Sequence, residues 1–150
     1  MAVSLNSKLS ENVAILATLD PASVSASTVV STWVPATNFH SLTVLIQTGV
    51  LGTSATIDAK LRQATDSSGT SAKDITGEAL VQIVKATGDN KQALIEITGD
   101  QLDATNGFGY VALSLTVGTA ASIVGAIIFG VNPRYTPASA YNQAAVVQTV

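Results

Sequence analysis

Hydrophobic and polar side chains alternate one by one along much of the chain, the pattern of β-strands that bury a single face. In residues 56–62, Ile57, Ala59 and Leu61 share one face, while hydroxyl and charged side chains occupy the other. The same alternation occurs in three further stretches: 42–47, 93–98 and 110–117. Because the period is two rather than 3.6, the sequence predicts a strand in each stretch.

Residues 122–131 differ in having apolar side chains on both faces. The two rows are Ile123, Ile127 and Phe129 on one face, and Val124, Ala126 and Ile128 on the other. We expect such a strand to be buried on both sides, in the centre of a sandwich or against a partner chain. Leu45 and Leu94 also lie on the otherwise polar faces of their strands. The sequence therefore predicts a self-association surface from five side chains: Leu45, Leu94, Ile123, Ile127 and Phe129.

Three other segments have weaker strand signals. β-Branched residues favour strands in 13–18 and 27–34, and favour a strand over a short helix in 78–86. A helical turn is expected at 100–103, where Asp100 can cap it. Turn-forming residues separate the strands at 49–52, 66–69, 87–90 and 106–109. About eight short strands at this spacing predict an all-β fold, an antiparallel β-sandwich or jelly roll.

The two ends of the chain lack the alternation of the middle. Residues 1–12 are polar and mixed, and residues 132–150 contain Pro133 and Pro137, which favour an extended path. We therefore expect one β-sandwich domain over 13–131, with an N-terminal arm and a C-terminal arm. The apolar run 144–147 leaves open whether the C-terminal arm docks on the domain or stays free.

The composition favours a protein that assembles with others. Charged residues make up 11% of the chain and hydrophobic residues 47%, with a mean hydropathy of +0.40. Soluble surfaces commonly carry about 25–35% charged residues, so part of this surface is expected to be an interface. Seven basic against ten acidic residues argue against a nucleic-acid partner. The longest apolar stretch, 120–131, is shorter than the roughly 18–20 residues of a membrane span, so no membrane partner is expected.

No residue pattern indicates catalysis, a cofactor or a metal. His40 is the sole histidine, cysteine is absent, and no Gly-x-Ser-x-Gly motif accompanies the serines. Asp100, Asp103 and Asn106 offer oxygen ligands but lack the spacing of an EF-hand loop, so turn and capping roles explain them. We expect no enzyme and no catalytic, cofactor or metal site. Trp33, the only tryptophan, is expected to pack in a core or interface rather than to stack on a sugar.

Strand and turn motifs in six segments form a recognisable set. They are STWV at 31–34, QTGVLG at 47–52, ATIDAKL with QATDSSGT within 55–70, AKDITG at 72–77, LD with NGF within 102–108, and NPRY at 132–135. Together they resemble the capsid decoration, or cement, proteins of tailed bacteriophages. The likeness spans about residues 13–138, and because its motifs are structural it implies a fold more than a chemistry.

The resemblance implies a jelly-roll-like sandwich on the outer surface of an HK97-type capsid. There it would bridge neighbouring major capsid protein subunits as a homo-oligomer, a dimer or trimer. The C-terminal arm, with Arg134, Tyr135 and Tyr141, is the expected capsid contact. Two other classes remain open: a receptor- or glycan-binding fibre module, and a tail-tube or head-completion subunit that forms rings of fixed copy number.

Overall fold

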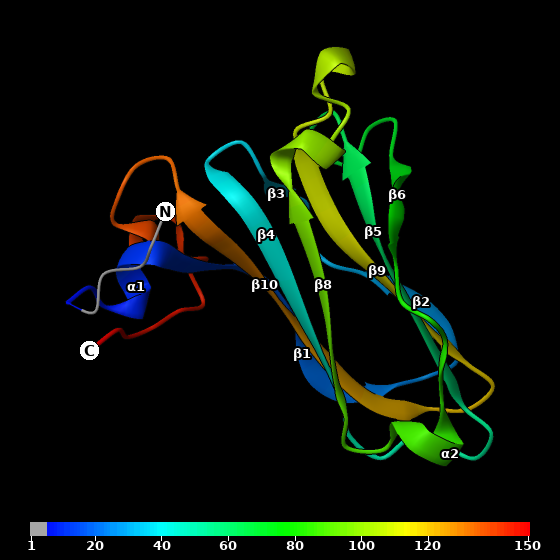
Figure 1. Cartoon of the computed structure of the whole chain (residues 1–150). Helices are drawn as coiled ribbons and strands as arrows, with labels where there is room; N and C mark the ends of the chain where they lie inside the picture. The colour runs from blue at the N-terminus through cyan, green and yellow to red at the C-terminus, as the bar shows by residue number, and fades with distance from the viewer. Residues whose placement is uncertain (1–5) are drawn as a thin grey trace.

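Two antiparallel β-sheets lie face to face in the computed structural model, which describes residues 6–150 (Figure 1). The four strands of the first sheet lie in the order β1 (Val13–Val24), β10 (Ser122–Pro133), β4 (Phe39–Thr48) and β8 (Gln92–Thr98). The second sheet has β2 (Ser27–Val30), β9 (Tyr110–Gly118), β5 (Thr56–Ala64) and β6 (Lys73–Ala79), with β3 (Val34–Pro35) beside β9 and β7 (Ile83–Val84) beside β5. The helical elements are short: α1 (Leu9–Asn12), α2 (Lys85–Gly88), and the 3₁₀ turns η1 (Gly99–Gln101), η2 (Ala104–Asn106) and η3 (Ala138–Tyr141).

The strand order is that of a jelly roll. β1 and β10, the first and last strands, are neighbours, and the chain changes sheet at almost every connection between its longer strands. All of the strand pairings are antiparallel. This arrangement confirms the all-β sandwich or jelly roll predicted from the sequence.

The core consists of the apolar rows that the alternation predicted. Each of the following side chains faces the opposite sheet and is at most 5% exposed: Leu42, Val44, Ile46, Ile57, Ala59, Leu61, Ile95, Ile97, Val111, Leu113, Leu115, Val117, Val124, Ala126 and Ile128. Removing such rows from water, at about 25 cal/mol per Å² of apolar area, is the main contribution to the stability of the fold.

Residues 122–131 are not buried on both faces in the centre of the sandwich, so that alternative is wrong, while burial against a partner chain stays a prediction. The row of β10 that faces the second sheet is buried, whereas Ile123 in the outward row is 46% exposed and Phe129 is half-buried. β10 lies between β1 and β4 in a two-layer structure, so only one of its faces meets the other sheet.

Two of the weaker strand predictions are also wrong. Residues 27–34 form β2 and β3 rather than one strand, because Ser31 leaves the regular ladder: its hydroxyl accepts a hydrogen bond from the Leu113 amide at 3.0 Å. Residues 78–86 are divided among the end of β6, β7 and α2. β6 itself was not predicted, because only Ile75 in it is buried and Gly77 has a φ of 85°, so the alternation is missing.

The C-terminal segment docks along β1, the edge of the first sheet. The Gln143 amide donates to the Ile15 carbonyl at 2.8 Å, and the Ile15 amide donates to Asn142 Oδ1 at 2.8 Å. The Tyr141 ring packs edge-on against Phe39, with ring centroids 5.4 Å apart. The C-terminal segment is therefore docked on the domain up to residue 143, and the alternative of a free segment is wrong for this part.

The first strand begins at Val13, the predicted start of the sandwich, and the last strand runs past the predicted end at residue 131. β10 continues to Pro133, and Ala138 of η3 is fully buried in the core. The region predicted as the N-terminal arm contains α1, and its residues 1–5 lie outside the described part of the chain.

The contact between Gly130 and Phe39 gives a test of the packing at this end of the core. A Cβ at position 130 would lie 2.6 Å from carbons of the Phe39 ring, which is 2% exposed and held by Tyr141. Gly130→Ala is expected to lower the free energy of unfolding by about 1–3 kcal/mol, measured by urea denaturation. Gly99→Ala is the control, because a Cβ there meets nothing within 4 Å. Equal losses in the two variants would contradict this account of the packing.

Candidate interaction surface

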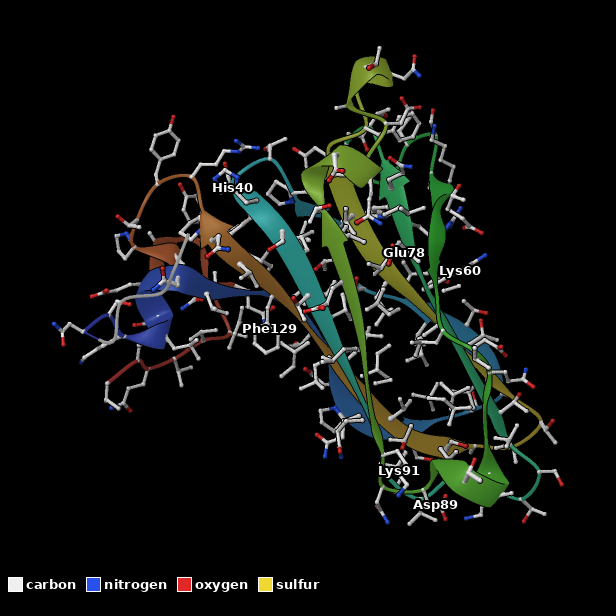
Figure 2. The ribbon with its side chains drawn as sticks, viewed as in Figure 1. His40, Lys60, Glu78, Asp89, Lys91 and Phe129 are labelled. Atoms are coloured by element: carbon white, nitrogen blue, oxygen red, sulfur yellow. The ribbon has the colours of Figure 1, made fainter. Side chains whose placement is uncertain are left out.

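The outward side of β10, β4 and β8 carries all five side chains predicted for self-association. We call this surface the apolar face; it comprises Leu45, Leu94, Ile123, Ile127 and Phe129. Ile127, Leu45 and Leu94 stand directly opposite one another on three adjacent strands, so they form one row across the sheet. Leu94 is 58% exposed and Ile123 46%, while the other three are half-buried. Phe129 projects from β10 on the side away from the second sheet (Figure 2).

A groove of about 370 Å³ runs along the apolar face beside β1. Pro21, Leu45, Ile123 and Ile127 line it. It lies where β1 bulges between Leu19 and Ala22, and a Cβ on Gly125 would come within 3.1 Å of Pro21. The groove was not predicted from the sequence. Its available signals were a proline and an isolated glycine inside strand patterns, which commonly mark bulges and close backbone approach.

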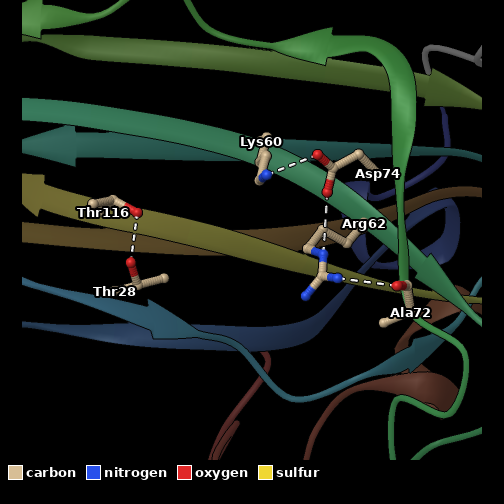
Figure 3. Close-up of polar contacts among 6 residues, drawn as sticks. All are labelled: Thr28, Lys60, Arg62, Ala72, Asp74 and Thr116. Atoms are coloured by element: carbon tan, nitrogen blue, oxygen red, sulfur yellow. Dashed lines mark hydrogen bonds and ion pairs between the residues drawn. The ribbon is translucent and has the colours of Figure 1, made fainter.

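The outward side of the second sheet has the opposite chemistry. Lys60 Nζ lies 2.7 Å and Arg62 Nε 3.2 Å from the Asp74 carboxylate, and Arg62 also donates to the Ala72 carbonyl at 3.0 Å (Figure 3). Nearby, the hydroxyls of Thr28 and Thr116 are 2.7 Å apart. The charges on this face therefore pair with one another and do not form a basic patch.

The three predicted capsid-contact residues have different environments. Tyr135 is 74% exposed. Arg134 is exposed, but its Nε donates to the Thr37 carbonyl at 2.7 Å. Tyr141 is half-buried and occupied by its contact with Phe39. Of the three, Tyr135 presents the freest side chain to a partner.

The side chains weighed for catalysis or metal binding are dispersed or engaged in turns. His40 is exposed at the start of β4 (Figure 2). Both oxygens of the Asp103 carboxylate accept hydrogen bonds from Asn106 Nδ2, at 2.9 and 3.0 Å, and Asp103 also pairs with Lys73. The hydrogen bond from Lys73 makes the largest contribution to lowering the pKa of the Asp103 carboxyl. Within residues 6–150, no three His, Cys, Asp or Glu side chains gather as a metal site would require.

The turn near residue 100 forms one residue earlier than predicted, over η1, and its capping residue is not Asp100. The Thr98 amide donates to Gln101 Oε1 at 2.8 Å, and the Thr98 hydroxyl donates to Asp100. The hydrogen bond from this hydroxyl makes the largest contribution to lowering the pKa of the Asp100 carboxyl.

Trp33 does not present an open stacking platform. It is half-buried, and a side chain at Gly69 would collide with its indole ring. In the described part of the chain, none of the helices has the length and hydropathy that crossing a bilayer requires.

No protein-family model matches the chain, and no curated protein does so either. Among solved structures it is similar to a chain of infectious bursal disease virus, Gt strain, with a TM-score of 0.43 and 11% identity over 93% of this chain and 38% of that one. It is also similar to a chain of Triatoma virus, with a TM-score of 0.42 and 10% identity over 94% of this chain and 74% of that one. The CBM22-1 xylan-binding domain of Paenibacillus barcinonensis Xyn10C gives a TM-score of 0.37 and 12% identity, covering 81% of each chain. At these identities and TM-scores, the similarity is limited to the general outline of the fold.

The Asp74 cluster predicts a specific dependence of stability on pH. The hydrogen bond from Lys60 is the largest cause that lowers the pKa of Asp74 from its usual 3.8, and the charges of Lys60 and Arg62 add to it. A carboxyl with a lowered folded-state pKa stabilises the fold above its unfolded pKa, and this contribution is lost as the pH falls through the folded value. Asp74→Asn is therefore expected to lower the free energy of unfolding near neutral pH by less than about 1 kcal/mol, because the pair is exposed. Denaturant unfolding well below pH 3.8 should show no difference, and a difference that persists there would contradict the assignment.

Proposed function

We propose that this protein is a virion structural protein that decorates the outer surface of a capsid and bridges major capsid protein subunits, acting as a homo-oligomer. The observation that carries the proposal is the apolar face, on which five large hydrophobic side chains lie outside the core. Exposed apolar clusters on stable proteins commonly mark interfaces, so this face supports a role in assembly.

Decoration requires complementary area rather than a reactive group. An interface of about 1,600 Å² is enough for specific binding, and many copies on one lattice reinforce each other through multivalency. Covering hydrophobic surface with another chain favours association, and the part that exceeds the entropy and desolvation costs of binding gives the affinity. On the opposite sheet, Lys60 and Arg62 pair with Asp74, so this face is compatible with contact with water.

The sequence motifs support the same role. The resemblance to phage decoration proteins covers about residues 13–138, which includes every strand of the described residues and the start of the docked C-terminal segment. In this proposal the exposed ring of Tyr135, with Arg134 beside it, contacts the shell. The partner there is the major capsid protein.

Introducing a charge into the apolar face tests the proposal on particles. Ile127→Lys puts a charge in the middle of the apolar face, where burial of an unpaired charge costs about 3–5 kcal/mol. We expect it to reduce the number of copies per purified particle at least about tenfold, measured by quantitative mass spectrometry. Thr28→Lys, on the polar face of the second sheet, is the matched control and should leave the copy number unchanged.

The copy number of the wild-type protein tests the role itself. Decoration predicts a number on the order of hundreds, in proportion to capsid subunits, because every equivalent lattice position offers the same site. About six or twelve copies would instead support a head-completion or tail ring. Absence of the protein from mature particles would overturn the proposal.

The tyrosines of the C-terminal segment give a second comparison. Tyr141→Ala removes the ring that packs on Phe39 and is expected to lower the free energy of unfolding by about 1–3 kcal/mol. Tyr135→Ala should change stability by less than about 0.5 kcal/mol, because the ring is exposed, but should weaken particle binding. Thermal unfolding and particle sedimentation measure the two effects. Particle binding by Tyr135→Ala at the wild-type level would remove Tyr135 from the proposed contact.

A further inference from the structure

Among residues 6–150, no strand pairs with the outer edge of β8, which borders the apolar face. The Thr48 amide donates to the Lys91 carbonyl at 2.9 Å, and the register continues without a break from Gln47–Gln92 to Ser41–Thr98. Backbone hydrogen bonds alternate in direction along an antiparallel strand, so alternate residues of β8 direct their amides and carbonyls away from β4. These residues are Gln92, Leu94, Glu96 and Thr98, and all four are exposed.

The hydrogen bond of Thr98 supports this assignment of direction. Its amide donates to the side chain of Gln101 at 2.8 Å rather than to β4. The three residues before it in the same alternation, Gln92, Leu94 and Glu96, therefore direct their backbone groups outward from the sheet. Figure 1 shows β8 at the border of the first sheet, beyond β4.

The other sheet edges of the described chain carry devices that block strand addition. β1 has two bulges and Pro21, and the segment at Asn142 and Gln143 occupies the backbone of Ile15. β6 has an irregular register, and β2 has only four residues. β8 contains neither a proline nor a bulge, and it has seven residues in continuous register.

We infer that β8 pairs with β8 of a second copy about a two-fold axis, joining two four-stranded sheets into one continuous eight-stranded sheet. The pairing is antiparallel, with Leu94 opposite Leu94 of the second copy. This register places Gln92 opposite Glu96 in both directions, so an amide faces each carboxylate and no like charges meet. The three outward-directed residues of each strand then exchange about six backbone hydrogen bonds.

This pairing enlarges the apolar face. That the enlarged face contacts the capsid lattice rests on the proposed function. The row of Ile127, Leu45 and Leu94 in each copy joins the same row in the other, because both sheets keep the same side outward. Leu94 lies in the contact between copies. The remaining four residues of the apolar face become part of one larger surface that faces the capsid lattice.

Single cysteines test the register directly, because the native chain contains none. Residues opposite one another in a hydrogen-bonded pair have Cα atoms about 5.5 Å apart, within the range of a disulfide. Leu94→Cys is expected to form a cross-linked dimer under mild oxidation at micromolar concentration, seen on non-reducing gels. Ile123→Cys is the control, since it is exposed on the same face but two strands away from the edge. Preferential cross-linking through Cys at position 123 would indicate face-to-face stacking and overturn the edge pairing.

A backbone change gives an independent test by light scattering. Leu94→Pro removes an amide hydrogen that points away from β4, so the fold should persist while the dimer dissociates at least about tenfold more readily than the Leu94→Ala dimer. Circular dichroism checks the fold of both variants. If wild-type protein is dimeric and Leu94→Pro remains equally so, the edge pairing is wrong, although self-association stands. A monomeric wild-type protein at tens of micromolar would also overturn the pairing, whereas the particle copy number judges the decoration role separately.

Discussion

A two-layer sandwich can bury only one face of each sheet, and this constraint determines the chemistry of the whole surface. The inward rows meet in the core and leave two outward faces. On the second sheet, Lys60, Arg62 and Asp74 satisfy one another in contact with water. On the first sheet, the apolar side chains of Leu45 and Ile127 remain only half-buried by residues 6–150. A partner that covers this face would remove the rest of their surface from water, which favours assembly through the first sheet.

The strands that the sequence predicted well are those in which the type of side chain alternates from residue to residue. The stretch predicted at 56–62 corresponds to β5, Thr56–Ala64, in which buried and half-buried side chains alternate. The stretch predicted at 110–117 corresponds to β9, Tyr110–Gly118, whose middle residues are buried on both faces, although large apolar side chains still alternate there with the small Ala112 and Ser114. The break between β2 and β3 could not be predicted from the neighbouring residues in the sequence. It depends on the hydrogen bonds between Ser31 and Leu113, which are distant in sequence.

The candidate surface was predictable residue by residue but not as a surface. Alternation indicated that Leu45 and Leu94 point away from the core, yet only the strand order puts them in one row with Ile127. The two tyrosines of the C-terminal segment show the reverse case. They look equivalent in the sequence, but Tyr141 packs on Phe39 while Tyr135 is exposed. That difference follows from hydrogen bonds between the segment and β1, which no local pattern reveals.

In a chain with few charged residues, the sheet edges need other means of protection against unwanted strand pairing. Natural β-proteins block edges with charged side chains, prolines, bulges or covering segments, because an open edge recruits other strands. Here β1 has a proline, bulges and a covering segment, whereas the outward residues of β8 before Thr98 include a single charge, Glu96. In a chain with 11% charged residues, an open edge that borders an apolar face would promote indiscriminate aggregation unless one defined partner occupied it. Pairing in the Leu94 register supplies such a partner, because it uses up the free backbone groups of both copies and leaves no further edge of that kind to extend.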